Sequence, residues 1–309
     1  MRNKYSIVIF GTGSIGRRHY EIAKKIPQCK CFIFSRSQIR NNKLQKIGYQ
    51  IFNFKETCDL GIIATESSNH SIDYAIYSIY ARKWLVEKPI ISINNFNEKI
   101  QFNRFSKKNI FVGYNKRFES GIKELKKLIS KNKLSYAHFK CFSNLNNWRN
   151  QDISKSISLK KDKGGGVINE LSHEIDLANF LIGGISKIDG ITKQRKYKLS
   201  DVEDTAFLKL NHNNGIKTKV DISFGCEKDV RKVILYFGEN KIIYNHLTGD
   251  IFKIINNKKY LYKNLKEDRN KSFERQINAL LKDDFSFSIP CSSYDGLSYI
   301  KLSKHLAWK

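Results

Sequence analysis

Three glycines near the amino terminus have the spacing of a phosphate-binding turn. The stretch VIFGTGSIGRRH places Gly11, Gly13 and Gly16 in a GxGxxG pattern, after a β-branched run and at the start of a helical pattern. In such a turn the first glycine permits the bend, the second lets backbone approach a pyrophosphate, and the third allows helix and strand to pack closely. The amides at the helix start then face the phosphates. We therefore expect a dinucleotide to be bound by Gly11, Thr12, Gly13, Ser14, Ile15 and Gly16.

The position that should select the ribose lies about 20 residues further on, at the end of the second strand. It holds Ser35, Arg36 and Ser37 and no acidic residue. A carboxylate there would bond the ribose hydroxyls and repel a 2′-phosphate, whereas an arginine between two hydroxyls suits a phosphate. The sequence predicts NADP as cofactor, with NAD as the alternative if Arg36 is a solvated surface residue.

The elements that must position this turn alternate between strand and helix over the first third of the chain. Short apolar runs predict strands, and the segments between them have helical spacing. Near-continuous apolar strands of this kind imply a parallel sheet covered on both faces. We expect a doubly wound Rossmann domain over residues 1–118, with strands near 5–10, 30–35, 49–54, 59–65, 83–89 and 109–115.

The pattern changes after about residue 118. An amphipathic helix, a half-exposed strand and a loop precede the stretch GGGVINELSHEIDLANFLIGG, which is expected to form one helix after its glycines. From about residue 186 strand-like segments follow one another without helices, which is typical of antiparallel sheets. We predict an α+β domain over residues 119–309, with a large, mainly antiparallel open sheet and two closing helices.

Composition limits the class of protein. The formal charge is +27, and hydrophobic residues make up 40% of the 309 residues. The lysines are spread over many segments without a nucleic-acid motif, so we attribute the charge to an AT-rich coding sequence and predict no nucleic-acid partner. No apolar run is long enough to span a membrane, and no signal peptide is evident. Six cysteines without zinc-ligand spacing indicate a reduced, cytoplasmic protein, and we predict no metal.

Polar residues follow three of the predicted strands. Ligands of open α/β sheets bind at these carboxyl ends, so the polar residues there are candidates for the site. They are Ala64 and Thr65 with His70 beyond them, Glu87 and Lys88 before Pro89, and Asn115, Lys116 and Arg117.

At this point the sequence resembles the glucose-fructose oxidoreductase / inositol dehydrogenase / rhizopine-catabolism (Gfo/Idh/MocA) family. The motifs GTGSIG, IIATESSNH, LVEKPI, GYNKRF and GGGVINELSHEID occur in that family's order and approximate spacing. Singly each motif is weak, but the combination is specific and spans nearly the whole chain. The resemblance implies an oxidoreductase that uses a nicotinamide cofactor on sugar-type substrates.

The family pattern also implies roles for individual residues. Glu87 is expected to contact the cofactor, Lys88 to lie near the nicotinamide and the substrate hydroxyl, and the peptide before Pro89 to be cis, which costs little for an X-Pro bond. The alternative is an ordinary surface lysine. Further expected cofactor contacts are Ala64, Thr65, His70 and Asn115, and Arg117 is expected to reach the substrate.

An acid–base group is expected on the helix that follows the glycine run. His173 and Asp176 are three residues apart, on one face of a helix. Oxidising an alcohol requires loss of a proton as hydride leaves, and histidine has the right proton affinity near neutral pH. The ammonium of Lys88 beside the same oxygen would stabilise its negative charge. Lys88 and His173, from separate domains, are therefore predicted to act on one substrate, with a structural histidine as the alternative.

The sequence departs from the family four residues before this histidine. The family often has aspartate there, whereas this chain has Asn169, and the nearest acid is Glu170. Glu170 could replace the aspartate, Asn169 could bond a substrate hydroxyl without titrating, and Asp176 could orient the imidazole. We keep Asn169 and Asp176 with Lys88 and His173 as the candidate catalytic residues.

The loop before the glycine run resembles a subgroup associated with surface-polysaccharide sugars, including nonulosonic acids. Trp148 is predicted to stack on a sugar face and Arg149 to pair with a carboxylate or phosphate. The alternative is a loop packed on its own tryptophan. The candidate substrate-binding residues are thus Lys88, Arg117, Trp148, Arg149, Asn169 and His173.

Two other functions remain open from sequence. The chain could be a redox-neutral NAD-using glycosidase, or a regulatory protein that senses a dinucleotide or a sugar. The presence of both Lys88 and His173 argues against a sensor with a dead site, whereas the glycosidase would keep its cofactor through purification and show no net absorbance change. By resemblance we also expect a dimer or tetramer that associates through the exposed face of the carboxy-terminal sheet.

Overall fold

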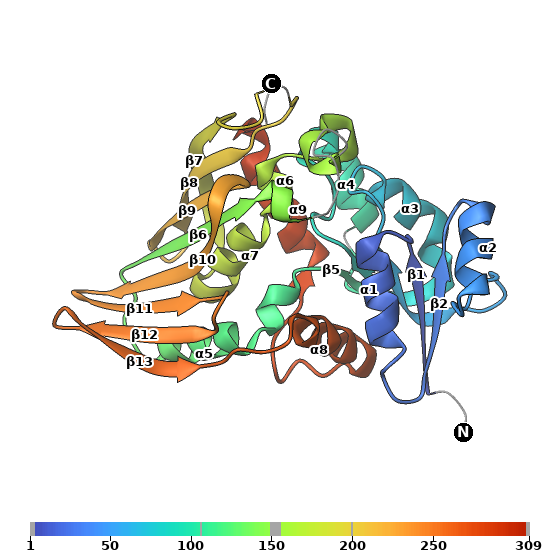
Figure 1. Ribbon diagram of the computed structural model, residues 1–309, viewed down its shortest axis with the longest axis horizontal. Helices are drawn as coiled ribbons and strands as arrows, with labels where there is room; N and C mark the ends of the chain where they lie inside the picture. Colours follow the sequence, from blue (N-terminus) through green and yellow to red (C-terminus); the bar gives the residue numbers. More distant parts are fainter. Residues whose placement is uncertain (1–3, 106, 149–155, 199, 307–309) are drawn as a thin grey trace. The chain divides into compact units, whose positions relative to one another are not determined.

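The computed structural model describes residues 4–105, 107–148, 156–198 and 200–306 (Figure 1). The chain divides into two compact units. The first contains residues 1–91, 97–118 and 269–297, and the second contains residues 92–96, 119–268 and 298–309. Among the described residues, no helix is long and apolar enough to cross a membrane.

The first unit is built on a six-stranded sheet with the order β14-β5-β4-β3-β1-β2. Five strands are parallel, and the two-residue β14 pairs antiparallel to β5 at one edge. The expected doubly wound parallel sheet is confirmed. Its strands are β1 (Tyr5–Phe10), β2 (Cys29–Phe34), β3 (Cys58–Ile63), β4 (Ala81–Val86), β5 (Ile110–Val112) and β14 (Cys291–Ser292).

Helices cover both faces of this sheet because the strands carry apolar side chains on both faces. One face packs on α1 and α8, with Ile7, Leu60 and Ile277 fully buried in one cluster. On the other face Phe10 stacks on Tyr77 of α3, with ring centroids 4.1 Å apart. The helices of the unit are α1 (Ser14–Ala23), α2 (Gln38–Lys46), α3 (His70–Tyr77), α4 (Glu98–Phe105), α8 (Arg269–Lys282) and the start of α9 (Ser293–Ser303), with short 3-10 turns η1 (Ser78–Tyr80) and η3 (Asn115–Phe118). The rest of α9, from residue 298, belongs to the second unit.

One expected strand is wrong. Residues 49–54 form only a single parallel bridge, between Ile33 and Ile51, and no strand. The backbone turns at Phe54, where φ is +62°. The apolar residues of this segment serve packing instead, since Phe52 makes edge contacts with the rings of Phe10 and Phe32.

The carboxy-terminal part of the chain is not confined to the second unit. We expected one continuous domain from residue 119 to 309, but residues 269–297 pack with the first unit. The reason is that β14 pairs with β5 and that Phe273, Ile277 and Leu280 of α8 bury their side chains against the face formed by β1 and β3. The change of unit after residue 118 lies where the sequence pattern changes.

The second unit contains an eight-stranded sheet with the order β13-β12-β11-β10-β6-β9-β8-β7. Only β6 and β9 are parallel neighbours, so the expected mainly antiparallel sheet is confirmed. Its strands are β6 (Tyr136–Asn144), β7 (Ile185–Lys193), β8 (Thr205–His212), β9 (Lys217–Ser223), β10 (Gly225–Phe237), β11 (Asn240–Asn245), β12 (Asp250–Ile255) and β13 (Lys258–Asn264).

Helices α5 (Ser120–Ser130) and α7 (His173–Ile182) pack on one another, and α7 lies against β6 and β9 (Figure 1). On the face of the sheet turned to them, Phe139, Val220 and Leu208 of the central strands are fully buried. The prediction of a single helix after the glycine run is wrong, because a turn divides this segment into two helices. A short α6 (Val167–Glu170) ends at Glu170, and α7 begins at His173 after a two-residue turn.

Candidate functional site

The glycine turn follows β1 in the first unit and leads into α1. Gly11 has φ of +120°, and a Cβ on it would lie 2.4 Å from the carbonyl oxygen of Ala64. A Cβ on Gly16 would lie 2.0 Å from the carbonyl oxygen of Gly11. Both positions therefore need glycine, because backbone of the turn, of α1 and of the end of β3 meet there.

The start of α1 has the features of an anion site. Its N-cap is Gly13, which has no side chain to cap the helix, and no acidic residue lies in the first turn. A Cβ on Gly13 would meet nothing within 4 Å, and the hydroxyl of Thr12 is buried without a partner among the described residues. Uncapped amides, open space and an unsatisfied hydroxyl fit a pyrophosphate, which needs donors and close backbone approach. Ser14 is exposed and Ile15 half-buried at this helix start.

The predicted ribose position forms the turn between β2 and α2. Ser37 caps α2 by accepting a hydrogen bond from the amide of Arg40 at 3.4 Å. The backbone of Ser35 is held by the side chain of Asn41, which accepts from its amide and donates to its carbonyl, both at 2.9 Å. The two serines therefore fix the shape of the turn, and both hydroxyls keep a proton to donate.

Arg36 in this turn has a carboxylate partner that sequence reasoning did not identify. Its guanidinium Nη2 lies 3.4 Å from Oδ1 of Asp73 in the first turn of α3. Asp73 is fully buried, and its Oδ2 accepts a 2.6 Å hydrogen bond from the hydroxyl of Thr65. About half of the Arg36 side chain is exposed, so donors of its five-donor fork remain available to a ligand.

His70 holds two strand ends together. Its Nδ1 lies 3.0 Å from the carbonyl oxygen of Pro89, and its Nε2 lies 3.2 Å from that of Thr65. Burial lowers the pKa of this imidazole, although the two carbonyls act in the opposite direction. A neutral imidazole has one N–H and can donate to only one carbonyl at a time. The ring is 1% exposed, so His70 positions the ends of β3 and β4, and its expected contact with a cofactor stays a prediction.

A buried hydrogen bond fixes Glu87 directly after β4. Its Oε1 accepts from Nε2 of His19 on α1 at 2.7 Å, and its Oε2 accepts from the amide of Lys88 at 3.2 Å. Burial by itself would raise the pKa of Glu87, but the His19 bond and the charges of His19 and Lys88 outweigh burial and lower it. Glu87 is therefore an ionised carboxylate held between the helix of the glycine turn and the lysine.

Lys88 and Pro89 follow this glutamate. The peptide between them is cis, as the resemblance implied. Asn115 lies at the start of η3, and its side-chain Nδ2 donates a 2.7 Å hydrogen bond to the hydroxyl of Ser272 on α8. Arg117 in the same turn is only 3% exposed. The first unit thus gathers the Glu-Lys-Pro segment, His70 and Asn115 at strand ends, as predicted from their positions in the sequence.

In the second unit, Asn169 makes a structural tie. Its Oδ1 accepts from the amide of Ile93 at 3.1 Å, and its Nδ2 donates to the carbonyl oxygen of Gly165 at 2.9 Å and to the hydroxyl of Ser92 at 3.4 Å. An ionised aspartate could not donate to a carbonyl oxygen, so this set of bonds fits the asparagine of this chain. The expected role of Asn169 toward substrate stays a prediction.

The other candidates of this unit lie around the break between α6 and α7. Glu170 accepts a 2.7 Å hydrogen bond from the hydroxyl of Ser158. His173 is the first residue of α7 and is half-buried, whereas Asp176 one turn later is fully buried. Because the break separates Asn169 from His173, the two residues do not share one helix face as a four-residue spacing would require.

The loop candidates have different outcomes. The ring of Trp148 makes an edge contact with the buried Phe224, with centroids 5.9 Å apart, and 36% of the residue is exposed. Trp148 is thus partly packed against the protein and partly exposed, and its predicted stacking on a sugar stays a prediction. Arg149 lies outside the described residues, so its predicted contact stays untested.

A buried acid supports the glycine run. Glu203 is 3% exposed, and its Oε1 accepts from the amide of Ile168 in α6 at 3.1 Å. A Cβ on Gly166, where φ is +107°, would lie 2.7 Å from the same oxygen. Burial raises the pKa of Glu203 to about 7, although the bond from Ile168 acts in the opposite direction. Glu203 therefore carries a proton over much of the range in which an ordinary glutamate is ionised.

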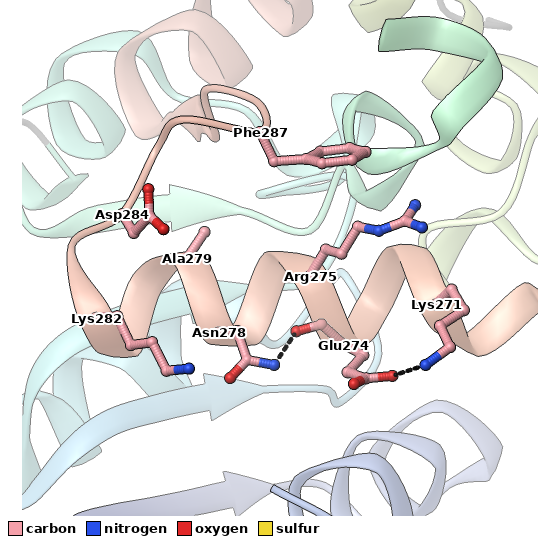
Figure 2. Close-up of a pocket in the computed structure, with 8 residues that line it drawn as sticks. All are labelled: Lys271, Glu274, Arg275, Asn278, Ala279, Lys282, Asp284 and Phe287. Atoms are coloured by element: carbon pink, nitrogen blue, oxygen red, sulfur yellow. Dashed lines mark hydrogen bonds and ion pairs between the residues drawn. The ribbon is translucent and has the colours of Figure 1, made fainter.

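A surface hollow of about 340 Å³ lies along α8, but it contains none of the predicted site residues (Figure 2). Its charges are largely engaged by the protein: Lys271 pairs with Glu274 at 3.0 Å, and the guanidinium of Arg275 lies over the ring of Phe287. Among the described residues, no group of three or more His, Cys, Asp or Glu side chains is arranged to hold a metal ion.

Sequence reasoning missed three residues that position the site. His19 lies three residues after Gly16, on the buried side of α1. Asp73 lies three residues after His70, one helical turn further along α3. Glu203 precedes β8. For the first two, a polar residue on the buried side of an amphipathic helix was a usable signal.

Two comparisons with known sequences bear on the family. Residues 122–243 match the family model described as GFO/IDH/MocA C-terminal domain. A Streptococcus pneumoniae protein described as an uncharacterized oxidoreductase is 24% identical over 161 residues, which are 50% of this chain and 44% of that relative. The match thus covers less than half of the relative's length.

Solved structures resemble the whole chain. Levoglucosan dehydrogenase in complex with NADH superposes with a TM-score of 0.80 at 14% identity, over 98% of this chain and 95% of that one. UDP-N-acetylglucosamine 3-dehydrogenase from Acidithiobacillus ferrooxidans gives 0.75 at 14% identity, over 98% and 96%. A putative NADPH-dependent oxidoreductase from Desulfitobacterium hafniense gives 0.81 at 13% identity, over 98% and 96%.

The chain has the fold of these solved oxidoreductases, whose matches span both units. The match to the GFO/IDH/MocA C-terminal domain model covers residues 122–243, in the second unit. These neighbours are oxidoreductases or dehydrogenases, and at least one of them holds NADH. At identities of 13–14% they establish the fold, and the activity of this chain is a separate inference.

The glycine turn generates a paired prediction. Gly13→Ala should change the free energy of unfolding by less than about 1 kcal/mol, because its Cβ meets no atom. It should weaken NADPH binding at least tenfold, because the methyl group would enter the space that we expect the pyrophosphate to occupy. Gly16→Ala should instead destabilise the fold by roughly 2 kcal/mol or more, because its Cβ overlaps the carbonyl of Gly11.

Urea unfolding and a titration of NADPH fluorescence separate the two effects. Full NADPH affinity in a stably folded Gly13→Ala variant would show that no pyrophosphate lies on this turn.

Glu203 predicts a pH dependence of stability. Its folded pKa of about 7 lies above the usual 4.5, so the folded state holds the proton more tightly than the unfolded state. Its contribution should be fully present below about pH 4.5 and be lost as the pH rises through 7, by on the order of 3 kcal/mol. Glu203→Gln keeps the bond to Ile168 and should remove this loss.

The measurement is the difference in unfolding free energy between wild type and Glu203→Gln at pH 5 and at pH 8. The exposed Glu239→Gln is the matched control. We expect the unfolding free energy of Glu203→Gln, relative to that of wild type, to be higher at pH 8 than at pH 5. If it is not, Glu203 is not a buried acid with a raised pKa.

Proposed function

We propose that this protein is a nicotinamide-dependent oxidoreductase that acts on a hydroxyl or carbonyl group of a sugar, sugar acid or nucleotide sugar. The observation that carries the proposal is the arrangement of the first unit. An uncapped helix start at Gly13 and the Glu87–Lys88 segment are tied to the same helix α1, through the 2.7 Å bond from His19 to Glu87. The names of the structural neighbours support the substrate class.

The bound nicotinamide would supply or accept the hydride. In this proposal the chain handles the proton and the charge on the substrate oxygen. The ammonium of Lys88 would stabilise negative charge on that oxygen, and His173 would take the proton in oxidation and return it in reduction. The half-buried position of His173 at the start of α7 leaves it able to exchange a proton.

We propose NADP as the preferred cofactor. Support comes from the half-exposed guanidinium of Arg36 and from the absence of an acid in the turn after β2. Asp73 pairs with one nitrogen of the guanidinium, Nη2, so the other N–H donors of Arg36 remain available to a phosphate. NAD remains the alternative, since neighbours with NADH and with an NADPH-dependent description share this fold.

The finer assignment concerns the substrate and the assembly. We propose an anionic or nucleotide-linked sugar of the surface-polysaccharide type, including nonulosonic acids, because of the loop with Trp148 and because a chain with a charge of +27 attracts anions. We also propose a homo-oligomer formed through the outer face of the eight-stranded sheet, and a cytoplasmic location.

Lys88→Ala is expected to lower kcat by about a thousandfold while NADPH affinity stays within about threefold, because the ammonium acts on the substrate oxygen. Turnover is followed by NADPH absorbance with UDP-N-acetylglucosamine and levoglucosan as probes, and binding by NADPH fluorescence. The exposed Lys107→Ala is the control of equal charge change. Unchanged turnover in Lys88→Ala would remove Lys88 from the mechanism, and product formation without any absorbance change would favour the redox-neutral alternative.

Arg36→Ala is expected to weaken NADPH binding about tenfold or more and to leave NADH binding nearly unchanged, because only NADPH has a 2′-phosphate. Both dissociation constants are measured by fluorescence at two salt concentrations. Arg40→Ala, an exposed arginine four residues later on α2, is the control. Equal loss of affinity for both cofactors would contradict the assignment of Arg36 to the 2′-phosphate.

A further inference from the structure

Two cysteines lie side by side on the edge strand of the first unit's sheet. Cys29 and Cys31 are two residues apart on β2, so their side chains project from the same face. Their sulfur atoms are 3.6 Å apart. Strand β2 is the last in the order β14-β5-β4-β3-β1-β2, so β1 is its only strand neighbour in that order. Neither cysteine is part of the cofactor or substrate site described above.

The two thiols differ in environment. Cys29 is half-buried, whereas Cys31 is 5% exposed and belongs to the core cluster beneath α1. The Cys31 thiol donates its hydrogen bond to the sulfur of Cys29. This bond lowers the pKa of Cys29 despite partial burial, and the same bond together with burial raises the pKa of Cys31. The more accessible sulfur is therefore the one that ionises more readily, which is the arrangement of an attacking and a resolving cysteine.

We propose that Cys29 and Cys31 are an oxidation site at which a hydroperoxide converts two adjacent thiols into a reversible disulfide within one strand. The Cys29 thiolate attacks one peroxide oxygen: an S–O bond forms, the O–O bond breaks, and the leaving hydroxide takes a proton to become water. The Cys31 sulfur then attacks the Cys29 sulfur: the S–S bond forms, the S–O bond breaks, and the hydroxide that leaves takes the Cys31 proton. In total, two thiols are oxidised, one H₂O₂ is reduced, and two waters form.

The strand geometry makes this bond reversible. Residues two apart on a strand have Cα atoms about 6.6–6.8 Å apart. Disulfides usually need Cα separations of about 4.4–6.8 Å, so β2 must contract locally to close the bond. An edge strand absorbs this contraction at the cost of its pairing with β1, where Tyr5 is opposite Cys29 and Ile7 is opposite Cys31. Strained disulfides are reduced readily, and the oxidised protein should be less stable than the reduced one.

The sequence offers a direct test because Lys30 lies between the two cysteines. The intact protein is treated with hydrogen peroxide, the remaining thiols are alkylated after unfolding, and the chain is cut with trypsin without reductant. Cleavage after Lys25, Lys30 and Arg36 separates peptides 26–30 and 31–36. A disulfide is expected to hold these two peptides together, with a mass 2 Da below that of the two free thiol peptides, and dithiothreitol should release them.

Variants separate this site from general oxidation. Cys31→Ser should stop at a sulfenic acid on Cys29 that dimedone traps, and Cys29→Ser should leave Cys31 reduced. Cys226→Ser should form the linked peptides as wild type does, since Cys226 is half-buried on β10 of the other unit. Separate peptides with Cys29 overoxidised in wild type, equally fast oxidation of Cys226, or a cross-link between two chains on a non-reducing gel would each overturn the proposal. None of these readouts depends on dehydrogenase activity.

Discussion

The bond between His19 and Glu87 is the interaction on which the rest of the first unit's site depends. An ionised carboxylate that is 7% exposed is unfavourable unless it is paired, and His19 satisfies it at 2.7 Å. His19 belongs to the helix that begins at the glycine turn, and Glu87 directly precedes Lys88. One buried pair therefore couples the position of a phosphate-binding helix to the position of the candidate catalytic lysine, and neither can shift without uncovering a charge.

The same principle governs the other polar residues at the strand ends. His70 is shared between the carbonyl groups of Thr65 and Pro89, and Asp73 between Thr65 and Arg36. In each case a buried polar side chain from α3 is satisfied by backbone or side-chain groups of neighbouring strand ends. Buried networks of this kind are rigid because each lost bond leaves a polar group unpaired in a low-dielectric interior. The expected result is a preformed rather than an adaptable cofactor site.

The second unit uses a neutral group for a comparable task. Asn169 both donates to Gly165 and accepts from Ile93, a combination that a carboxylate cannot provide. The segment 92–96, which follows the Glu-Lys-Pro motif along the chain, is thereby fixed within the second unit. An acid in this region appears instead at Glu203, where burial raises the pKa of the carboxyl group to about 7. The departure from the family pattern is thus consistent with a structural role for this position.

The sequence by itself determined the type of each unit and the location of the glycine turn. Periodicity and strand-ending glycines are local properties, and they suffice to place β1, α1 and the strand ends that hold Lys88 and Asn115.

The tertiary structure decided which residues meet. The pairing of His19 with Glu87, 68 residues apart, depends on how α1 crosses the sheet, and no local pattern records it. Likewise the apolar segment 49–54 reads as a strand, yet the aromatic packing of Phe52 and the turn at Phe54 prevent pairing. The return of α8 to the first unit has the same cause, since its apolar face fits a surface built from strands more than 180 residues earlier in the chain. Long-range burial selects such arrangements, and it is a property of the folded whole rather than of any segment.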